Sequence, residues 1–470
     1  MSTTAFPGRS AAGLSGLLHR DRSIADIGYS RWMVPPAALC MHLCIGQAYA
    51  FSVFNLPMSR LIGITQSAPD DWKLTDLGWI FSIAIFFLGL SAALLGRWVE
   101  EGGPRRAMFA AALCWSGGFM VSAFGIYIHN IWLVYLGYGV LGGCGLGIGY
   151  ISPVSTLIKW FPDRPGMATG MAIMGFGGAA FIASPLSVWL MQQFSTPTHV
   201  GVAETFVVLG VIYFFFMMVG AALVRLPPPG WAPAGYVVPD QPKKLITTKN
   251  VFVYQALKTP QFWLIWWVLC LNVTAGIGVL GQASAMSQEM FPGKVTVTAA
   301  AGFVGLMSLF NMGGRFFWAS VSDYIGRKNT YFVFFFLGVL LYSAVPQTGE
   351  LGSVALFVLC FCVIMSMYGG GFATVPAYLR DMFGTRYVGA IHGMLLTAWS
   401  MAGIFGPVLV NYIRQYNVEH GVAKAAAYNV TMYVMAALLM VGFFCNLFIR
   451  EVHERHHMKH DEADAMGMAD

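Results

Sequence analysis

Residues 303–328, FVGLMSLFNMGGRFFWASVSDYIGRK, form a long apolar run that holds one arginine and ends in a charged loop. Arg315 precedes the loop residue Asp323 by eight positions, which at 1.5 Å per residue places it about 12 Å inside the end of a predicted helix. That depth is near the middle of a hydrocarbon layer about 30 Å thick. A charge there costs at least ~2.5–3.5 kcal/mol, so it normally faces a cavity and serves function. The alternative is that the Arg315 side chain extends to the lipid headgroups.

The whole chain has the composition of a polytopic membrane protein. Of its 470 residues, 57% are hydrophobic and 10% are charged, whereas a soluble chain carries about 25% charge. The mean hydropathy is +0.65. The net charge of +6 is therefore no evidence for a nucleic-acid partner. We expect no cleavable signal peptide in residues 1–31, and we expect the eight cysteines to be buried free thiols.

Twelve apolar runs are long enough to cross a membrane as helices. They are 33–56, 77–96, 107–128, 131–152, 167–190, 204–224, 262–285, 299–320, 330–346, 353–376, 388–412 and 428–449. We predict an all-α polytopic membrane protein with twelve transmembrane helices in two pseudo-symmetric six-helix bundles. The predicted parts are an N-terminal segment 1–31, a first bundle 32–225, a linker 226–260, a second bundle 261–450 and a tail 451–470.

The distribution of Lys and Arg predicts which helix ends face the cytoplasm. If both termini are inside, the outer loops hold only Arg60, Lys73, Lys294, Arg414 and Lys424. Apart from Arg315, all the others of the 27 Lys and Arg then lie in inner segments. This asymmetry predicts a multi-pass protein of the cell (inner) membrane with both termini in the cytoplasm.

The two sets of helices repeat one another. GRWVEEGGPRR at 96–106 follows the second helix and ASVSDYIGRK at 319–328 follows the eighth, with Glu100 and Asp323 at an offset of 223 residues. WFPDR at 160–164 and MFGTR at 382–386 keep an offset of 222. A duplicated six-helix unit is typical of a transporter whose site lies between the two halves.

With these motifs the chain resembles the major facilitator superfamily, and the two charged loops look like the gating loops of that family. The candidate gating residues are Glu100, Arg105, Arg106, Asp323, Arg327 and Lys328. A carboxylate in such a loop can bind the N-terminus of a neighbouring helix. The first copy departs from the family pattern, because Glu100 replaces an Asp and Glu101 replaces a basic residue. The alternative is that both loops are ordinary charged turns.

Arg315 has no counterpart in the first half, because the offset of 223 leads to Ala92. A charge in one half only suggests a ligand with one strongly held anionic group. An arginine fork binds a carboxylate through two parallel hydrogen bonds. Asn311 lies four residues earlier on the same helix face and could add a hydrogen bond, or could simply hold two helices together.

Other candidate substrate-binding residues lie on other predicted helices. Trp399 and His392 are seven residues apart and share a face. Trp399 could form a cavity wall, and His392 could carry a proton or be a packing residue. Tyr368 precedes Gly369–Gly371, a point where a helix could bend. The other candidates are Tyr150 and Gln282, and the weaker ones are His42, Gln47, Tyr49 and Asn272.

More specifically, the chain resembles the oxalate:formate antiporter family, which is related to the monocarboxylate transporters. The matching stretches are Gly46–Val53, Lys159–Arg164, Asn272–Gly278, Gly314–Arg315 and Thr397–Trp399. The resemblance implies that Arg315 anchors a carboxylate. Two departures matter. Trp399 stands where oxalate-exchanging members carry a Lys, which argues against a dicarboxylate because its second charge would be buried without a partner. Asn311 stands where proton-coupled animal carriers have an Asp.

Together these features predict a secondary active transporter of a small monocarboxylate of lactate, pyruvate or formate size, working by alternating access. The alternative is oxalate/formate-type anion exchange, and a non-transporting sensor or a channel is a further alternative. The expected partners are the carboxylate anion, a coupled proton or counter-anion, and the lipid bilayer. We expect no enzymatic activity, no cofactor and no metal, and we interpret the histidine-rich stretch 453–460 as a solvated tail.

Overall fold

The fold is described from a computed structural model, which describes residues 16, 18–26, 28–236, 245–247 and 249–458. In these residues the regular structure is helical apart from three isolated β-bridges. Of the histidine-rich stretch, His460 lies outside them. His453, His456 and His457 lie inside, and the stretch contacts the linker, because the Met458 amide donates to the carbonyl oxygen of Asn250.

Eleven helices in the described residues are long and apolar enough to cross a membrane. The first, Arg31–Met58, contains α2 (Val34–Ile45), the 3-10 stretch η3 (Gly46–Phe54) and α3 (Asn55–Met58). The others of the first half are α4 (Leu74–Gly102), α5 (Pro104–Tyr127), Ile131–Trp160 with α6 (Ile131–Val134), the π-helix η4 (Tyr135–Gly142) and α7 (Gly143–Trp160), α8 (Pro165–Phe194) and α9 (Val202–Leu223).

The second half follows the short helix α10 (Val253–Ala256). Its spans are α11 (Pro260–Leu280), α14 (Arg327–Glu350), α15 (Val354–Phe383), Val388–Glu419 with α16 (Val388–Leu395) and α17 (Thr397–Glu419), and Lys424–Leu447 with α18 (Asn429–Leu447). The twelfth helix is α13 (Val297–Ile325), which at 29 residues is as long as α4.

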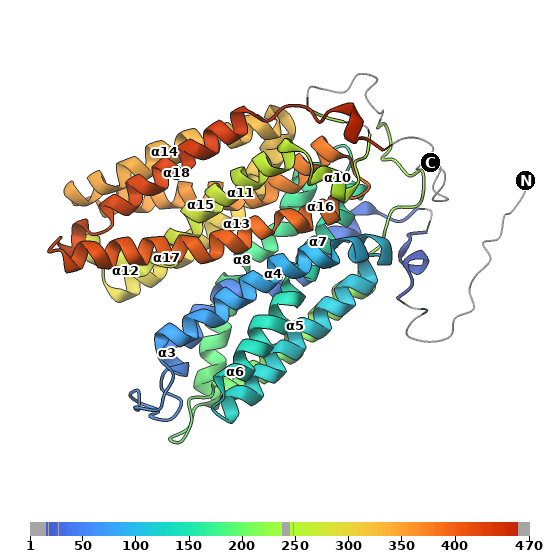
Figure 1. The fold of residues 1–470 in the computed structure, drawn as a ribbon. Coiled ribbons are helices and arrows are strands. Elements are labelled where there is room, and N and C mark those ends of the chain that lie inside the picture. Colours follow the sequence, from blue (N-terminus) through green and yellow to red (C-terminus); the bar gives the residue numbers. More distant parts are fainter. Residues whose placement is uncertain (1–15, 17, 27, 237–244, 248, 459–470) are drawn as a thin grey trace, which may run out of the picture.

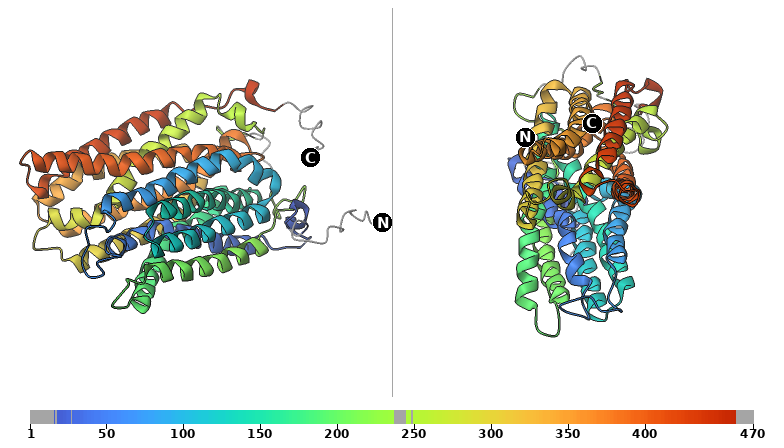
Figure 2. Two further views of the ribbon diagram at one scale, coloured as in Figure 1. Left: turned by 60° about the horizontal axis from the view of Figure 1, so that its bottom comes forward. Right: turned by 90° about the vertical axis from the view of Figure 1, so that its left-hand side faces the viewer.

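The helices before and after the linker form two groups that meet at one end and diverge toward the other (Figures 1 and 2). The meeting end holds the Gly102–Pro104, Trp160–Pro165, Ile325–Arg327 and Phe383–Val388 connections, and we call it the terminal face. The opposite end, which holds α3 and α12 (Ala283–Met290), is called the loop face. A site between the groups is therefore closed more tightly on its terminal side.

Small residues let the two groups approach closely near the terminal face. A Cβ at Gly393 of α16 would overlap the carbonyl oxygen of Ala92 on α4. Within the second group, a Cβ at Gly314 of α13 would overlap the carbonyl oxygen of Ser366 on α15. The run Gly369–Gly371 also allows close packing, and α15 continues through it from Val354 to Phe383.

The predicted helix over 262–285 is wrong at its end. Helix α11 stops at Leu280, and α12 begins at Ala283 after a two-residue break at Gly281 and Gln282. Two cation–carboxylate contacts hold α12 against α17: Arg414 Nε donates to Glu289 Oε2 at 2.9 Å, and Arg414 Nη2 binds Glu289 Oε1. The loop-face end of this span is thus a separate short helix.

The Glu289–Arg414 pair is expected to stabilise the protein at neutral pH and to lose its effect in acid. Burial alone would raise the pKa of Glu289, but hydrogen bonds from Arg414 and Tyr428 hold it below its ordinary value. The stabilisation is therefore fully present above the ordinary pKa of about 4.3 and is lost as pH falls through the lowered folded value. In thermal melting, Glu289→Gln should have a free energy of unfolding about 1 kcal/mol below that of wild type between pH 8 and pH 5. A constant difference down to pH 3 would contradict this.

The two ends of the linker are attached to different groups of helices, and the tail joins the second end. At the linker start, the amide of Leu226 donates to the carbonyl oxygen of Ser23 at 2.6 Å. At its end, the Val251 amide donates to the carbonyl oxygen of Phe383 at 3.0 Å, and Met458 pairs with Asn250. The start of the linker is therefore tied to the first group, and its end to the second.

All eight cysteines are free, as expected, but the prediction that all are buried is wrong for half of them. Cys40, Cys114, Cys144 and Cys445 are only half-buried within the protein.

Candidate functional site

Arg315 is completely buried, with an exposed fraction of 0%. Its Nε donates to Asn311 Oδ1 at 3.0 Å. Among the described residues neither Nη1 nor Nη2 makes a hydrogen bond of normal geometry, although the hydroxyls of Tyr49 and Tyr150 lie near enough to interact with the guanidinium. The alternative that Arg315 extends to the lipid headgroups is therefore wrong. The other buried arginine of this region, Arg327, differs because it forms ion pairs with Asp323 and Asp381.

Aromatic rings from both groups of helices surround the Arg315 guanidinium. Its carbon lies 5.6 Å from the ring centre of Phe176 on α8 and 5.1 Å from that of Phe372 on α15. The ring of Trp399 on α17 packs against both, at 5.4 Å and 4.5 Å. A guanidinium against such faces gains cation–π attraction. We call this enclosure, formed by Phe176, Phe372, Trp399 and Tyr150, the aromatic chamber.

Donors with no partner point to a ligand in the aromatic chamber. Besides the two Arg315 nitrogens, Trp399 Nε1 and the Tyr150 hydroxyl lack partners among the described residues. The Tyr150 ring packs at 5.4 Å from Trp399 and 5.5 Å from Phe176, and its hydroxyl interacts with the Arg315 charge. Leaving buried donors unpaired costs about 1–3 kcal/mol each. An acceptor with several lone pairs, such as a carboxylate, would satisfy several of them at once.

Two tyrosines close the aromatic chamber on its loop-face side. The hydroxyls of Tyr49 on η3 and Tyr368 on α15 are 3.0 Å apart. Tyr49 also packs against Phe176 at 5.0 Å, and Tyr368 against Phe372 at 5.2 Å. This hydrogen bond joins the two groups on the loop-face side of Arg315.

The terminal-face side is closed by a larger polar contact around Asp323. Its carboxylate accepts the backbone N–H groups of Gly166 at 2.9 Å and Met167 at 2.8 Å, which are the free donors at the start of α8. Arg327 Nη2 donates to Asp323 at 2.6 Å and Arg327 Nε to Asp381 at 3.2 Å. This network joins the second group to the first.

The first copy of the charged loop is built differently. Glu100 accepts from Ser155 Oγ at 3.2 Å and binds Lys159 Nζ, both within its own group. Arg106 stacks over Trp98 at 5.0 Å, and Arg105 lies at the start of α5. Lys328 of the second copy donates to the last carbonyls of α18, at Leu447 (2.9 Å) and Ile449 (2.7 Å). The two loops therefore occupy equivalent positions in the two groups but make different contacts.

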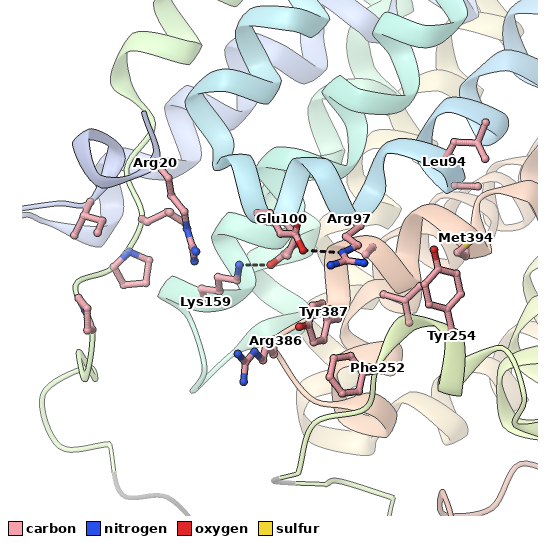
Figure 3. A pocket seen from close by; sticks show the side chains of 18 of the residues that line it. Arg20, Leu94, Arg97, Glu100, Lys159, Phe252, Tyr254, Arg386, Tyr387 and Met394 are labelled. Carbon is pink, nitrogen blue, oxygen red and sulfur yellow. Dashed lines mark hydrogen bonds and ion pairs between the residues drawn. The ribbon is translucent and has the colours of Figure 1, made fainter. Parts of the chain in front are cut away.

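A terminal-face pocket of about 910 Å³ lies between the two groups and the ends of the linker (Figure 3). Arg97, Lys159 and Arg386 reach toward it, and Ala390 and Met394 of α16 line its wall. His392 lies between those two positions on the opposite side of α16, because residues two apart on a helix point in opposite directions. Helix α16 thus separates this pocket from the buried side of His392.

Six of the seven predicted substrate-binding residues come together. Arg315, Asn311, Tyr150, Tyr368, Trp399 and His392 are linked by the contacts described above and by the Tyr150–His392 ring contact at 5.9 Å. Gln282 does not join them, since it is half-buried in the break between α11 and α12. Phe176 and Phe372 were not predicted. Both stand beside glycine runs, in Gly175–Gly178 and Gly369–Phe372, and that pattern was the available signal.

A sequence model described as Major Facilitator Superfamily matches residues 37–407. The oxalate:formate antiporter of Oxalobacter formigenes is 28% identical over 379 residues, covering 80% of this chain and 83% of the relative. The uncharacterized MFS-type transporter YhjX of Escherichia coli K12 is 23% identical, covering 80% and 86%. Human monocarboxylate transporter 11 is 25% identical, covering 78% and 76%.

Solved structures show the same fold. The proton:xylose symporter XylE has a TM-score of 0.63 at 14% identity, covering 90% of this chain and 96% of that chain. The E. coli fucose:proton symporter FucP has a TM-score of 0.63 at 13% identity, covering 90% and 100%. At these identities the likeness concerns the fold alone.

Proposed function

Since this chain belongs to the major facilitator superfamily, and is therefore a secondary transporter and not an enzyme, we propose that it carries a small monocarboxylate. The observation behind the proposal is the pair of partnerless Arg315 nitrogens in a fully buried chamber between the two groups of helices. A guanidinium offers a carboxylate two parallel N–H bonds with matching geometry. The anion would also neutralise a charge that is otherwise buried alone.

The proposal includes an orientation and a cycle. The excess of Lys and Arg on the terminal face supports a cytoplasmic location for that face. The structure then corresponds to a carrier that is closed toward the cytoplasm and loosely closed toward the outside by Tyr49 and Tyr368. Substrate would enter when these hydroxyls separate, and would leave when the Asp323 contact with α8 opens. Rocking of two halves about a central site is the common mechanism for this architecture.

The aromatic chamber favours one carboxylate over two. Apart from Arg315, the described groups around it are aromatic rings, hydroxyls, an amide and imidazoles, so a second carboxylate would lie against Trp399 and Phe372 without a fixed cation. The Trp399 Nε1 and the Tyr150 hydroxyl could instead donate to a 2-hydroxy or 2-oxo oxygen. This supports lactate or pyruvate as cargo.

A second candidate is exchange of oxalate and formate. The observation in its favour is the 28% identity to an oxalate:formate antiporter.

A substrate panel on purified, reconstituted protein separates monocarboxylate transport from oxalate/formate exchange. We expect counterflow of labelled L-lactate or pyruvate to exceed that of oxalate at least ~10-fold, because an unpaired buried charge costs more than the ~1.4 kcal/mol behind that factor. Strong oxalate exchange together with no lactate flux would refute the first candidate. Conductance without saturation would indicate a channel.

A further inference from the structure

Two buried histidines, His42 and His392, flank Tyr150 beside the aromatic chamber. The proposed function gives His42 no role in binding the carboxylate. The ring centres of His42 on α2 and Tyr150 are 5.4 Å apart, and those of Tyr150 and His392 on α16 are 5.9 Å apart. All three side chains are at most 1% exposed. His42 and His392 come from different groups of helices, so this row crosses the boundary at which the two groups separate.

His42 is held as a base. Its Nδ1 lies 3.1 Å from the carbonyl oxygen of Ala38, one turn earlier on α2, so Nδ1 carries the proton that this acceptor requires. The Nε2 of the neutral ring then carries a lone pair. Among the described residues Nε2 makes no hydrogen bond of normal geometry, although the backbone of Tyr150 lies close to this ring. A proton could bind there without breaking an existing hydrogen bond.

The charge of Arg315 acts on His42. The Tyr150 ring lies 5.4 Å from the His42 ring and 5.5 Å from the Phe176 ring, and Phe176 lies 5.6 Å from the Arg315 guanidinium carbon. A protonated His42 and Arg315 would therefore repel each other across these two rings. With Arg315 unpaired, a second positive charge on His42 is disfavoured, since both would lie in a low-dielectric interior. When a carboxylate binds Arg315, the pair becomes neutral overall and the repulsion disappears. Anion binding and protonation of His42 must then favour each other by the same factor, because linkage is reciprocal.

Other ionisable groups lie on the helices packed around the two imidazoles. They are Glu204 and Tyr213 on α9, Asp76, Arg97, Glu100 and Glu101 on α4, Cys144 and Lys159 on α7, Cys360, Cys362, Tyr368, Tyr378, Arg380 and Asp381 on α15, Cys40 and Cys44 on α2, and Tyr49 on η3. The electrostatic partners of His42 are Arg315 and His392, and the partner of His392 is His42. No carboxylate acts on either ring among the described residues.

A path from this row toward the cytoplasmic side follows from α16. Ala390 and Met394 line the terminal-face pocket, and His392 lies between them on the other side of the helix. When α16 moves away from Ala92 and α4, the side of the helix that carries His392 would open toward that pocket. A proton on the row would then have an exit on the same side as the substrate.

We infer that His42 is the proton acceptor of this carrier, and that one proton is carried on His42 with each monocarboxylate. The proton comes from water on the loop face, binds His42 Nε2 when the anion occupies Arg315, and leaves to water on the terminal face. One anion and one proton cross together, so the step is electroneutral. This inference rests on the proposed function.

The decisive measurement is the dissociation constant of L-lactate for the purified protein between pH 5.5 and 8.5. Linkage predicts that wild-type affinity weakens up to ~10-fold per pH unit over part of this range. In His42→Asn the affinity should be independent of pH. Asn keeps a donor near the Nδ1 position for the Ala38 carbonyl and removes the Nε2 base. His42→Gln is a second variant with a different shape, in case the first misfolds.

His420→Asn is the matched control. His420 makes the same bond one turn back, from Nδ1 to the carbonyl oxygen of Tyr416 at 2.8 Å, but is exposed at the end of α17. It should keep the wild-type pH dependence. In proteoliposomes, lactate accumulation driven by an inward proton gradient should fall at least tenfold in His42→Asn and stay at the wild-type level in His420→Asn.

The possible outcomes separate this inference from the proposed function. A wild-type dissociation constant that does not change with pH, or a pH dependence that survives in both His42 variants, would overturn the inference while leaving Arg315 as the carboxylate anchor. Absence of both lactate binding and counterflow in wild type would overturn the proposed function and this inference with it. Loss of pH dependence in His42→Asn with retained lactate binding supports both.

Discussion

Arg315→Lys is expected to weaken lactate binding at least ~10-fold and to reduce transport accordingly. The substitution keeps the positive charge but removes the planar fork, so at most one of two parallel N–H bonds to the carboxylate remains. A hydrogen bond to a charged group is worth ~1.5–3 kcal/mol, which corresponds to about a 10- to 150-fold change in affinity. The lysine also loses the bond that Arg315 Nε makes to Asn311 Oδ1. Equilibrium binding and counterflow of labelled lactate measure the effect.

Arg414→Lys is the matched control for this experiment. Arg414 lies on α17 of the same half and binds Glu289, which is outside the aromatic chamber. The same substitution there should leave lactate affinity unchanged within about twofold. Normal affinity in Arg315→Lys would refute the bidentate role of Arg315. A loss in both variants would point to general destabilisation, which melting temperatures would reveal.

Asp323→Asn is expected to shift the carrier toward the state that is open on the terminal face. The Asp323 carboxylate receives two backbone N–H groups from α8 and one bond from Arg327. Asn keeps a single acceptor and no charge, so about 1–3 kcal/mol of closure should be lost. That free energy corresponds to a shift of about 5- to 150-fold in the equilibrium. Maximal transport should fall, because return to the closed state becomes limiting.

The shift can be read from the reactivity of a cysteine placed at Ala319, which is fully buried next to Gly166. In a background without native cysteines, Asp323→Asn should speed labelling of this position by about the same factor. Asp163→Asn is the control: Asp163 lies on the same face but binds Arg31 within the first group, at 2.7 Å. Unchanged labelling in Asp323→Asn, or an equal increase in the control, would show that Asp323 does not hold the contact.

Much of the fold follows from hydropathy alone. Twelve apolar runs predict twelve helices because each must satisfy its backbone groups internally within a membrane. Sequence periodicity could not show that Gly46–Phe54 winds as a 3-10 helix or that the seventh span breaks at Gly281–Gln282, because both depend on tertiary packing. The Gly369–Gly371 run was identified as a point where a helix could bend, and the structure shows close packing there. Glycine permits both bending and close packing, and only the neighbours Asn311, Trp318 and Asn272 show which applies.

The site likewise contains residues that the sequence could indicate and residues that it could not. Arg315 could be identified from the sequence because a lone charge in an apolar run is energetically costly. The repeat showed that the charge is asymmetric. Phe176 and Phe372 could not be singled out, because phenylalanine is common in this chain and its position over a guanidinium depends on which helices meet. Gln282 was expected on a helix face, and the break in the span moved it away.

The attachment of the linker has a practical consequence for protein engineering. Leu226 is tied to the first six helices, and Val251 is tied to the second six. Fully extended, residues 227–249 could reach ~75 Å at about 3.3 Å per residue, so the connection imposes no length restraint on the halves. A plasmid encoding residues 1–236 and 245–470 as two co-expressed polypeptides should therefore yield a functional non-covalent heterodimer, with affinity tags placed at the new ends.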